Sequence, residues 1–215
     1  KRLALTEYQE QRRGGTGRRA AKMKEGDVIE QVFVANTHGK VLCFSNLGRV
    51  YALDVYMIPE GARNTKGKAI INLLPLQEGE KISIALPVNA FEDNHFVFMA
   101  TENGVVKKTP LTEFAQVLKA GKIAIKLDDG DGLIGVAITD GTHDVMLFSD
   151  AGKAVRFEES GVRSMGRTAR GIGGIRLEEG QKVIALLVAE DDNQLVLTAC
   201  ENGYGTVSYT HLTLP

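Results

Sequence analysis

The sequence predicts an all-β fold made of repeated four-stranded antiparallel blades, and three observations indicate it. Glycine is abundant, with 24 residues among 215, whereas the chain has 5 prolines and no tryptophan. The apolar runs are short and separated by turn residues, which is typical of many short strands. Two segment patterns recur about every fifty residues, and a period of that length indicates a repeat architecture.

The first recurring segment consists of an apolar run, a turn that ends in glycine, and a second run. Its copies are residues 39–51, 94–107, 142–155 and 192–204, with turn glycines Gly48, Gly104, Gly152 and Gly203. These glycines lie 56, 48 and 51 residues apart. Two of the turns contain Asn-Gly, a pair that tolerates positive φ and favours a hairpin. We therefore expect one hairpin in each repeat.

A second recurring segment alternates with the first. Its copies, residues 23–34, 76–86, 127–138 and 177–187, begin with a polar turn at Gly26, Gly79, Gly130 and Gly180 and continue as an apolar run. The runs are too short and too β-branched for a stable helix. Each repeat is thus about four strands long, the size of one propeller-type blade. A blade cannot cover both its faces alone, so we expect blades to pack on their neighbours around an axis.

Composition and charge narrow the function classes. No run approaches the roughly 18 apolar residues that span a membrane, and nothing resembles a signal peptide. The two cysteines, Cys43 and Cys200, lie in strand-like runs and are expected to be buried and reduced, as in a cytoplasm. The four histidines have no ligand-like neighbours, so no metal site is expected. Residues 1–24 carry eight Lys/Arg against two Glu, a net charge of +6, so the remaining residues sum to −7.

A short basic segment on a mildly acidic body indicates a localised anionic partner, although a solvated charged face would give the same composition. Its centre is an arginine- and glycine-rich loop with the sequence Gln11-Arg12-Arg13-Gly14-Gly15-Thr16-Gly17-Arg18-Arg19. Glycines let the backbone approach a partner and expose N–H groups to phosphate oxygens, and arginines supply forked donors. None of this chemistry reads a base edge, so we expect contacts to a sugar–phosphate backbone. The alternatives are a basic surface turn or a free-nucleotide site; the Walker pattern is absent.

Further basic residues fall in the corresponding segment of the later repeats. Besides Arg18, Arg19 and Lys22, the predicted rim contacts are Arg63, Lys66, Lys68, Lys119, Lys122, Arg163, Arg167 and Arg170. Equivalent placement in each repeat would set basic loops around one rim, as is needed to hold a bent duplex at several points. For each loop taken alone, a solvated turn is the alternative.

The heptad Gln11–Gly17 resembles the Q-R-R-G-G-K-G box in the C-terminal domain of the bacterial gyrase A protein, with Thr16 in place of the family lysine. Leu5-Thr6-Glu7-Tyr8 before the heptad and the fifty-residue repeat extend the resemblance over residues 1–205. The resemblance implies a β-pinwheel, a propeller-like disc of six blades that exchange strands, with about four blades represented here. It also implies that DNA bends around the basic outer rim and that the box is needed for this wrap.

The resemblance also implies a place in a larger enzyme, DNA gyrase. The box residues would be Gln11, Arg12, Arg13, Gly14, Gly15 and Gly17, with Thr16 at the variant position. The domain would bind duplex DNA, hold no cofactor and catalyse nothing alone. Its partners would be the N-terminal domains of gyrase A and the whole of gyrase B, in an A2B2 holoenzyme that uses ATP and Mg²⁺ for negative supercoiling. The location would be the bacterial cytoplasm, at the nucleoid, without a membrane.

The ends of the chain give a final expectation. Lys1–Tyr8 align with Lys107–Phe114 at an offset of 106 residues, so we expect the chain to begin inside a blade and residues 1–205 to form a partial domain. Residues 206–215 do not continue the repeat, and we expect a foreign tail that packs poorly. Two alternatives stay open: the related C-terminal domain of topoisomerase IV, which generally lacks an intact box, and a propeller-like platform for protein partners.

Overall fold

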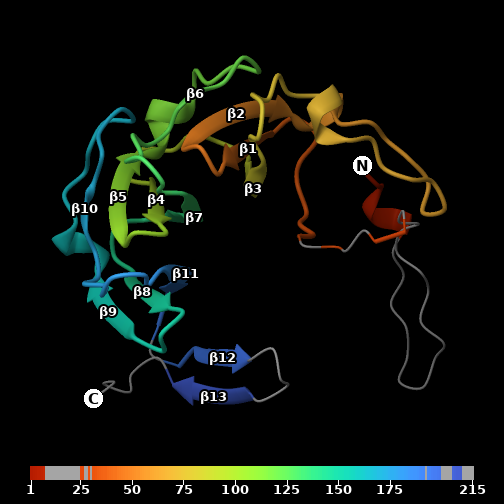
Figure 1. The fold of residues 1–215 in the computed structure, drawn as a ribbon. Helices are drawn as coiled ribbons and strands as arrows, with labels where there is room; N and C mark the ends of the chain where they lie inside the picture. Colours follow the sequence, from red (N-terminus) through yellow and green to blue (C-terminus); the bar gives the residue numbers. More distant parts are fainter. Residues whose placement is uncertain (8–24, 27–28, 30, 192, 200–204, 210–215) are drawn as a thin grey trace.

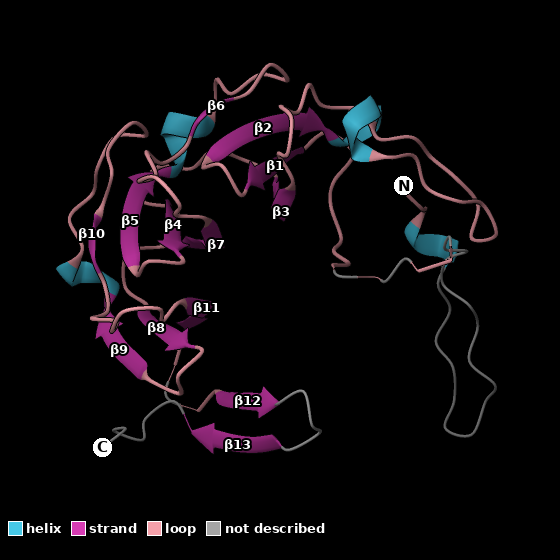
Figure 2. Cartoon of the chain, in the orientation of Figure 1, coloured by secondary structure: helices cyan, strands magenta, loops and turns pink. Residues whose placement is uncertain are grey.

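A computed structural model describes residues 1–7, 25–26, 29, 31–191, 193–199 and 205–209. The strands are β1 (Lys40–Ser45), β2 (Arg49–Asp54), β3 (Ile82–Val88), β4 (Phe96–Thr101), β5 (Val105–Pro110), β6 (Lys122–Ile123), β7 (Leu133–Thr139), β8 (Asp144–Ser149), β9 (Ala154–Glu158), β10 (Ile172–Gly173), β11 (Val183–Ala189), β12 (Leu195–Ala199) and β13 (Gly205–Tyr209). Among these residues, helix occurs only as the 3-10 turns η1 (Leu5–Glu7), η2 (Val55–Met57), η3 (Ile70–Asn72), η4 (Leu111–Phe114) and η5 (Glu159–Gly161). The predicted all-β class is confirmed (Figure 2).

The strands form antiparallel sheets that exchange a strand with the following repeat. The described sheets have the orders β3-β1-β2-β6, β10-β5-β4-β7, β11-β8-β9 and β12-β13. In the two four-stranded sheets, three strands come from one repeat, and the fourth comes from the next. That fourth strand is two residues long: β6 pairs with β2, and β10 pairs with β5. The predicted four-stranded blade is confirmed, with its outermost strand supplied by the neighbouring repeat.

Each hairpin turn uses the same polar device. The N–H of the turn glycine donates to the carbonyl three residues earlier, at Ser45, Thr101 and Ser149. The hydroxyl of that same residue accepts from the N–H that follows the glycine, at Arg49, Val105 and Lys153. Gly48, Gly104 and Gly152 have φ of +70°, +81° and +74°, which explains why these turns end in glycine. The predicted turns are confirmed at these three positions, and Gly203 lies outside the described residues.

The second sheet is buried on both faces because the first and third sheets stack against it. Along β1, Leu42 and Phe44 pack in a core shared with Val97 and Met99 of the next sheet. The intervening Val41 and Cys43 belong to a second core on the opposite face. On β4, Phe98 and Ala100 likewise reach a third core shared with Val145 and Leu147. The central strands are therefore continuous apolar runs, and the predicted packing of blade on blade is confirmed.

Cys43 is a free thiol in this interior, and burial raises its pKa to about 12, so it stays protonated and inert near neutral pH. Cys200 lies outside the described residues.

The described sheets follow one another along an arc (Figure 1). The first and third sheets each contact the second through β3, β7 and β11, the strands at the inner side of the arc. β6 and β10 lie at the opposite edge of their sheets, on the outer side. Each sheet therefore runs from an inner edge to an outer rim, and the residues that lead into β6 and β10 cross that rim.

The last described segment is the hairpin of β12 and β13, in which Leu195 pairs with Tyr209 and Ala199 with Gly205. β13 begins at the expected domain boundary, residue 205, and runs on for four residues of the segment expected to be a foreign tail. Residues 210–215 lie outside the described part. The origin of residues 206–215 stays a prediction.

Candidate nucleic-acid interface

The predicted box lies outside the described residues. This holds for Gln11, Arg12, Arg13, Gly14, Gly15, Thr16 and Gly17, and equally for Arg18, Arg19 and Lys22. Their roles therefore stay predictions based on their chemistry and on the family motif. The described part of the interface lies in the later repeats.

Three later loops carry the other predicted contacts, and we call them the first, second and third basic loops: residues 61–68, 119–126 and 163–171. The second loop contains β6, and the third leads directly into β10. Because β6 and β10 form the outer edges of their sheets, both loops cross the outer side of the arc (Figure 1). The first loop begins beside the bridge that pairs Arg2 with Glu60. The equivalent bridge at the start of the third loop pairs Lys108 with Ser164, so these two loops occupy the same place in their repeats.

Within these loops, one group of basic side chains points to solvent. Lys66, Lys68, Lys119, Arg163 and Arg170 are exposed, and Lys122 is half-buried. Arg170 forms an ion pair with Asp128 of the preceding repeat. For Lys66, Lys68, Lys119 and Arg163, no ion pair occurs with any residue that the structure describes. These four cations are free to meet phosphate oxygens without first breaking a described ion pair.

Arg63 and Arg167 belong to a different group, because they join neighbouring repeats. Arg63 Nε lies 3.1 Å from a carboxylate oxygen of Glu7, and Arg167 Nε lies 3.7 Å from Glu113. Glu7 and Glu113 hold the same place in the aligned repeats, and so do the two arginines. The arginine side chains are 33% and 22% exposed, so the pair is set into the junction between blades. Both arginines were predicted as rim contacts, and the geometry gives them a structural partner instead of a free guanidinium.

A further charged residue of this region, the buried Lys107 on β5, was not singled out from the sequence. Its side chain is fully buried, and Nζ donates to the carbonyls of Ala124 at 2.7 Å, Ala169 at 3.1 Å and Arg167. Burial lowers the pKa of Lys107 to about 8, and the nearby Arg167 acts in the same direction. The sequence signal that could have found Lys107 is the pair of adjacent lysines in β5, a strand that is buried on both faces.

Tyr51 stands on β2 where Lys107 stands on β5, three residues after the turn glycine. It is fully buried, and its hydroxyl donates to Glu80 at 2.7 Å. Its ring packs against Gly121 of the second basic loop, where an added Cβ would lie 2.4 Å from a ring carbon. The loop is thus held against the sheet by close packing at this junction.

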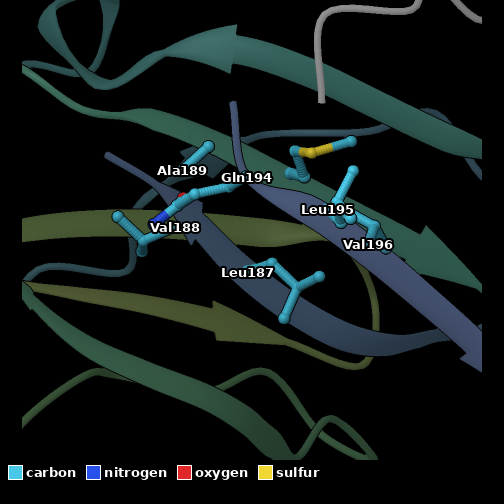
Figure 3. A pocket seen from close by; sticks show the side chains of 7 residues that line it. Leu187, Val188, Ala189, Gln194, Leu195 and Val196 are labelled. Atoms are coloured by element: carbon cyan, nitrogen blue, oxygen red, sulfur yellow. The ribbon is translucent and has the colours of Figure 1, made fainter. Parts of the chain in front are cut away.

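One hollow among the described residues is apolar. A hollow of about 280 Å³ lies between the third sheet and β12, and it is lined by Met146, residues 187–189 and residues 194–196 (Figure 3). Its only polar side chain is Gln194, so it has nothing to hold a phosphate. Nowhere in the described residues do three or more His, Cys, Asp or Glu side chains gather as a metal would require. No helix in the described part is long and apolar enough to cross a membrane.

Comparison with protein families adds a match along most of the chain. The model of the DNA gyrase C-terminal domain, described as a beta-propeller, matches residues 1–36, 39–89, 95–140 and 143–190. The first matched segment covers the later part of a repeat, and each of the other three covers one repeat. The three later segments each begin just before one of the hairpins β1–β2, β4–β5 and β8–β9. The three later family segments therefore agree with the predicted repeat length of about fifty residues.

Individual proteins agree with this match. The DNA gyrase A protein of Escherichia coli strain K12 is 56% identical over 201 residues, which cover 94% of this chain and 23% of the relative. A solved DNA gyrase A C-terminal domain superposes with a TM-score of 0.75 at 30% identity, over 98% of this chain and 68% of that one. The C-terminal domain of DNA topoisomerase IV gives 0.74 at 30% identity, over 80% and 53%. The chain spans about a quarter of the length of the curated relatives it matches.

Proposed function

Since the chain belongs to the DNA gyrase C-terminal domain family, we propose that it binds and wraps duplex DNA without sequence preference, as part of a gyrase. The observation that carries this proposal is the recurrence of exposed cations on loops at the outer side of the arc. Lys119, Arg163 and Arg170 lie on two successive loops that cross the outer edges of adjacent sheets. A duplex that follows this rim would meet phosphate-binding groups at successive blades.

The secondary structure supports backbone binding rather than base reading. Proteins that read the major groove usually insert an α-helix or a two-stranded ribbon. The only helices among the described residues are 3-10 turns of three or four residues, and the exposed cations stand on loops. Arginine and lysine on loops bind phosphates, and phosphate contacts position a protein without specifying sequence. We therefore propose similar affinity for unrelated duplexes.

The distribution of charge supports a central role for the box. Residues 1–24 carry +6, and the rest of the chain carries −7. A body with a negative sum repels DNA on average, so favourable contacts have to be concentrated. Bending 20–30 base pairs by 40–90° costs on the order of 1–6 kcal/mol, and several phosphate anchors are needed to offset it. The arginines around residues 11–19 supply the densest set of such anchors.

The proposed role in the whole enzyme is that of a non-catalytic module. The domain would hold duplex DNA while the other domains of gyrase A, together with gyrase B in an A2B2 holoenzyme, cleave and pass DNA with ATP and Mg²⁺. Its location would be the bacterial cytoplasm, at the nucleoid. For this chain we propose no catalytic residue and no cofactor of its own.

The topoisomerase IV domain is the second candidate, because its solved structure is as similar in fold and in identity as the gyrase domain. The sequence Gln11–Gly17 favours gyrase, since the family box is present with a single replacement at Thr16. The proposal of DNA binding is tested by titrating the chain with two unrelated duplexes at moderate salt. Equal binding to both is expected. Absence of binding to either would leave the propeller-like platform for protein partners as the better interpretation.

A further inference from the structure

Lys107 forms hydrogen bonds to two neighbouring basic loops. An ammonium group has three N–H donors, and each has a carbonyl acceptor: Ala124 in the second loop, and Arg167 and Ala169 in the third. The backbone adds one more tie, because the N–H of Lys126 donates to Ala169 at 3.2 Å. The two loops that carry Lys119, Arg163 and Arg170 are therefore joined at one buried point.

The same arrangement recurs at Lys1, which aligns with Lys107. Lys1 Nζ donates to the carbonyls of Ala62 at 2.8 Å, Arg63 at 3.1 Å and Thr65 at 2.8 Å, all in the first basic loop. Arg63 and Thr65 lie 104 residues before Arg167 and Ala169, the spacing that separates Gly48 from Gly152. Equivalent lysines thus bond to equivalent carbonyls in two junctions. Recurrence at corresponding atoms indicates a constraint of the architecture rather than an accident of one loop.

The blade itself does not need a lysine at this position. Tyr51 holds the aligned place in the repeat between, and Val155 holds it in the repeat after. Burying an ammonium is costly even when it is well bonded, and apolar residues at such sites are often neutral or stabilising. A lysine here therefore has a role that a valine could not have, because it forms hydrogen bonds to the carbonyls of an adjacent loop.

We propose that Lys107, with Lys1 in the equivalent place, is a positioning residue for DNA binding. It holds the basic loops so that their exposed cations keep a fixed separation along the outer rim. Lys107 is fully buried and does not reach a phosphate itself. Holding the loops beforehand lowers the ordering cost of each phosphate contact, in the way that preorganisation raises affinity generally. The inference rests on the proposed DNA binding. A side chain outside the interface then sets the spacing of the phosphate contacts.

The test replaces Lys107 with methionine (Lys107→Met) in the 215-residue chain. Two quantities are measured: amide exchange in residues 119–126 and 163–171, and affinity with a hydroxyl-radical footprint on a mixed-sequence duplex. We expect faster exchange in both loops and an affinity about tenfold lower, equivalent to about 1.4 kcal/mol. The footprint should lose protection at one stretch of phosphates and keep it elsewhere.

Lys108→Met is the matched control, because it removes an equal charge from the next residue. Lys108 is also buried, and its Nζ donates to the carbonyl of Glu159 instead of to a basic loop. The exchange of residues 119–126 and the affinity should stay as in the unmodified chain. Lys1→Met is a second variant, to be used if Lys107→Met fails to fold. It should speed amide exchange only in residues 61–68.

The outcomes separate this inference from the function on which it rests. Failure of the unmodified chain to bind the duplex would overturn the proposed function. Binding by the unmodified chain, with equal affinity and equal loop exchange in Lys107→Met, would overturn the positioning role alone. If Lys107→Met is unfolded, unchanged exchange and affinity in Lys1→Met would overturn it as well.

Discussion

Two kinds of basic side chain share the loops at the outer rim. Arg163 is exposed and without an ion pair among the described residues, whereas Arg167 is 22% exposed and lies beside Glu113. Their position in the loop does not separate them, because both are arginines of one loop at a predicted rim position. The distinction depends on the preceding repeat, which supplies Glu113 across the junction. Glu7 and Arg63 repeat the contact, so an aligned Glu–Arg pair one repeat apart was the available signal.

The two arginines make a matched pair for a test of this division. Arg163→Ala and Arg167→Ala remove the same charge from the same loop. Arg163→Ala should reduce the slope of log K against log[salt] by about 0.9, because one phosphate contact is lost. Arg167→Ala should change the slope less and lower the free energy of unfolding by up to about 1 kcal/mol, since it breaks a partly exposed ion pair. Equal slopes for the two variants would argue against the division.

The buried Lys107 predicts a particular dependence of stability on pH. Its pKa is about 8 in the folded chain, because of burial and Arg167, against 10.5 ordinarily. Between these values the unfolded chain binds more protons than the folded chain, so the free energy of unfolding rises with pH. Lys107→Met should lack this rise in the free energy of unfolding. The rise is at most ~3 kcal/mol, because one pKa unit corresponds to about 1.4 kcal/mol. Urea unfolding at pH 7, 8, 9 and 10 measures it; parallel curves for both chains would contradict the buried ammonium.

At the scale of elements, the hairpins could be predicted and the exchanged strands could not. The runs around Gly48, Gly104 and Gly152 carry their own turn signals, and their pairing is local in the chain. β6 and β10 have two residues each, and their partners lie in the preceding repeat. A segment of two residues has no periodicity to detect. The box is the opposite case, because its sequence pattern is strong, and it lies outside the described residues.

Gly121 allows a test of how a basic loop is held at a junction. Its φ is +77°, and an added Cβ would lie 2.4 Å from the Tyr51 ring. Gly130 has a φ of +78° with nothing within 4 Å, so it is a matched control for backbone strain. Gly130→Ala should cost about 1–2 kcal/mol from the left-handed conformation, and Gly121→Ala about 1–3 kcal/mol more from overpacking. Urea midpoints measure both, and equal losses would show that the loop does not pack on Tyr51.

At the scale of the whole molecule, the stacking of sheets on one another follows from the small size of the repeat. Because one repeat supplies only three long strands, each sheet depends on its neighbours for its outer strand and for the cover of its faces. The unit size predicted this dependence, and the shared cores confirm it. The sequence did not show which strand lies at the inner edge, since the central strand β4 and the inner strand β7 are similarly apolar.

The whole-molecule architecture predicts a circular-dichroism spectrum dominated by strands and turns. Globular domains average about a third helix, whereas the only helices among the described residues are 3-10 turns. A measured helix content above about a fifth would contradict the repeat architecture.

The central claim is that binding is electrostatic, indifferent to sequence and centred on the basic segment of residues 1–24. Its net charge of +6 stands against −7 for the remaining residues. The measurement is log K against log[salt] on two unrelated duplexes, for the unmodified chain and for a variant with Arg12, Arg13, Arg18 and Arg19 replaced by alanine. If each arginine neutralises one phosphate, the slope should fall by about 3.6, at roughly 0.9 per contact, and affinity should fall alike on both duplexes. An unchanged slope, or a loss confined to one duplex, would contradict the claim.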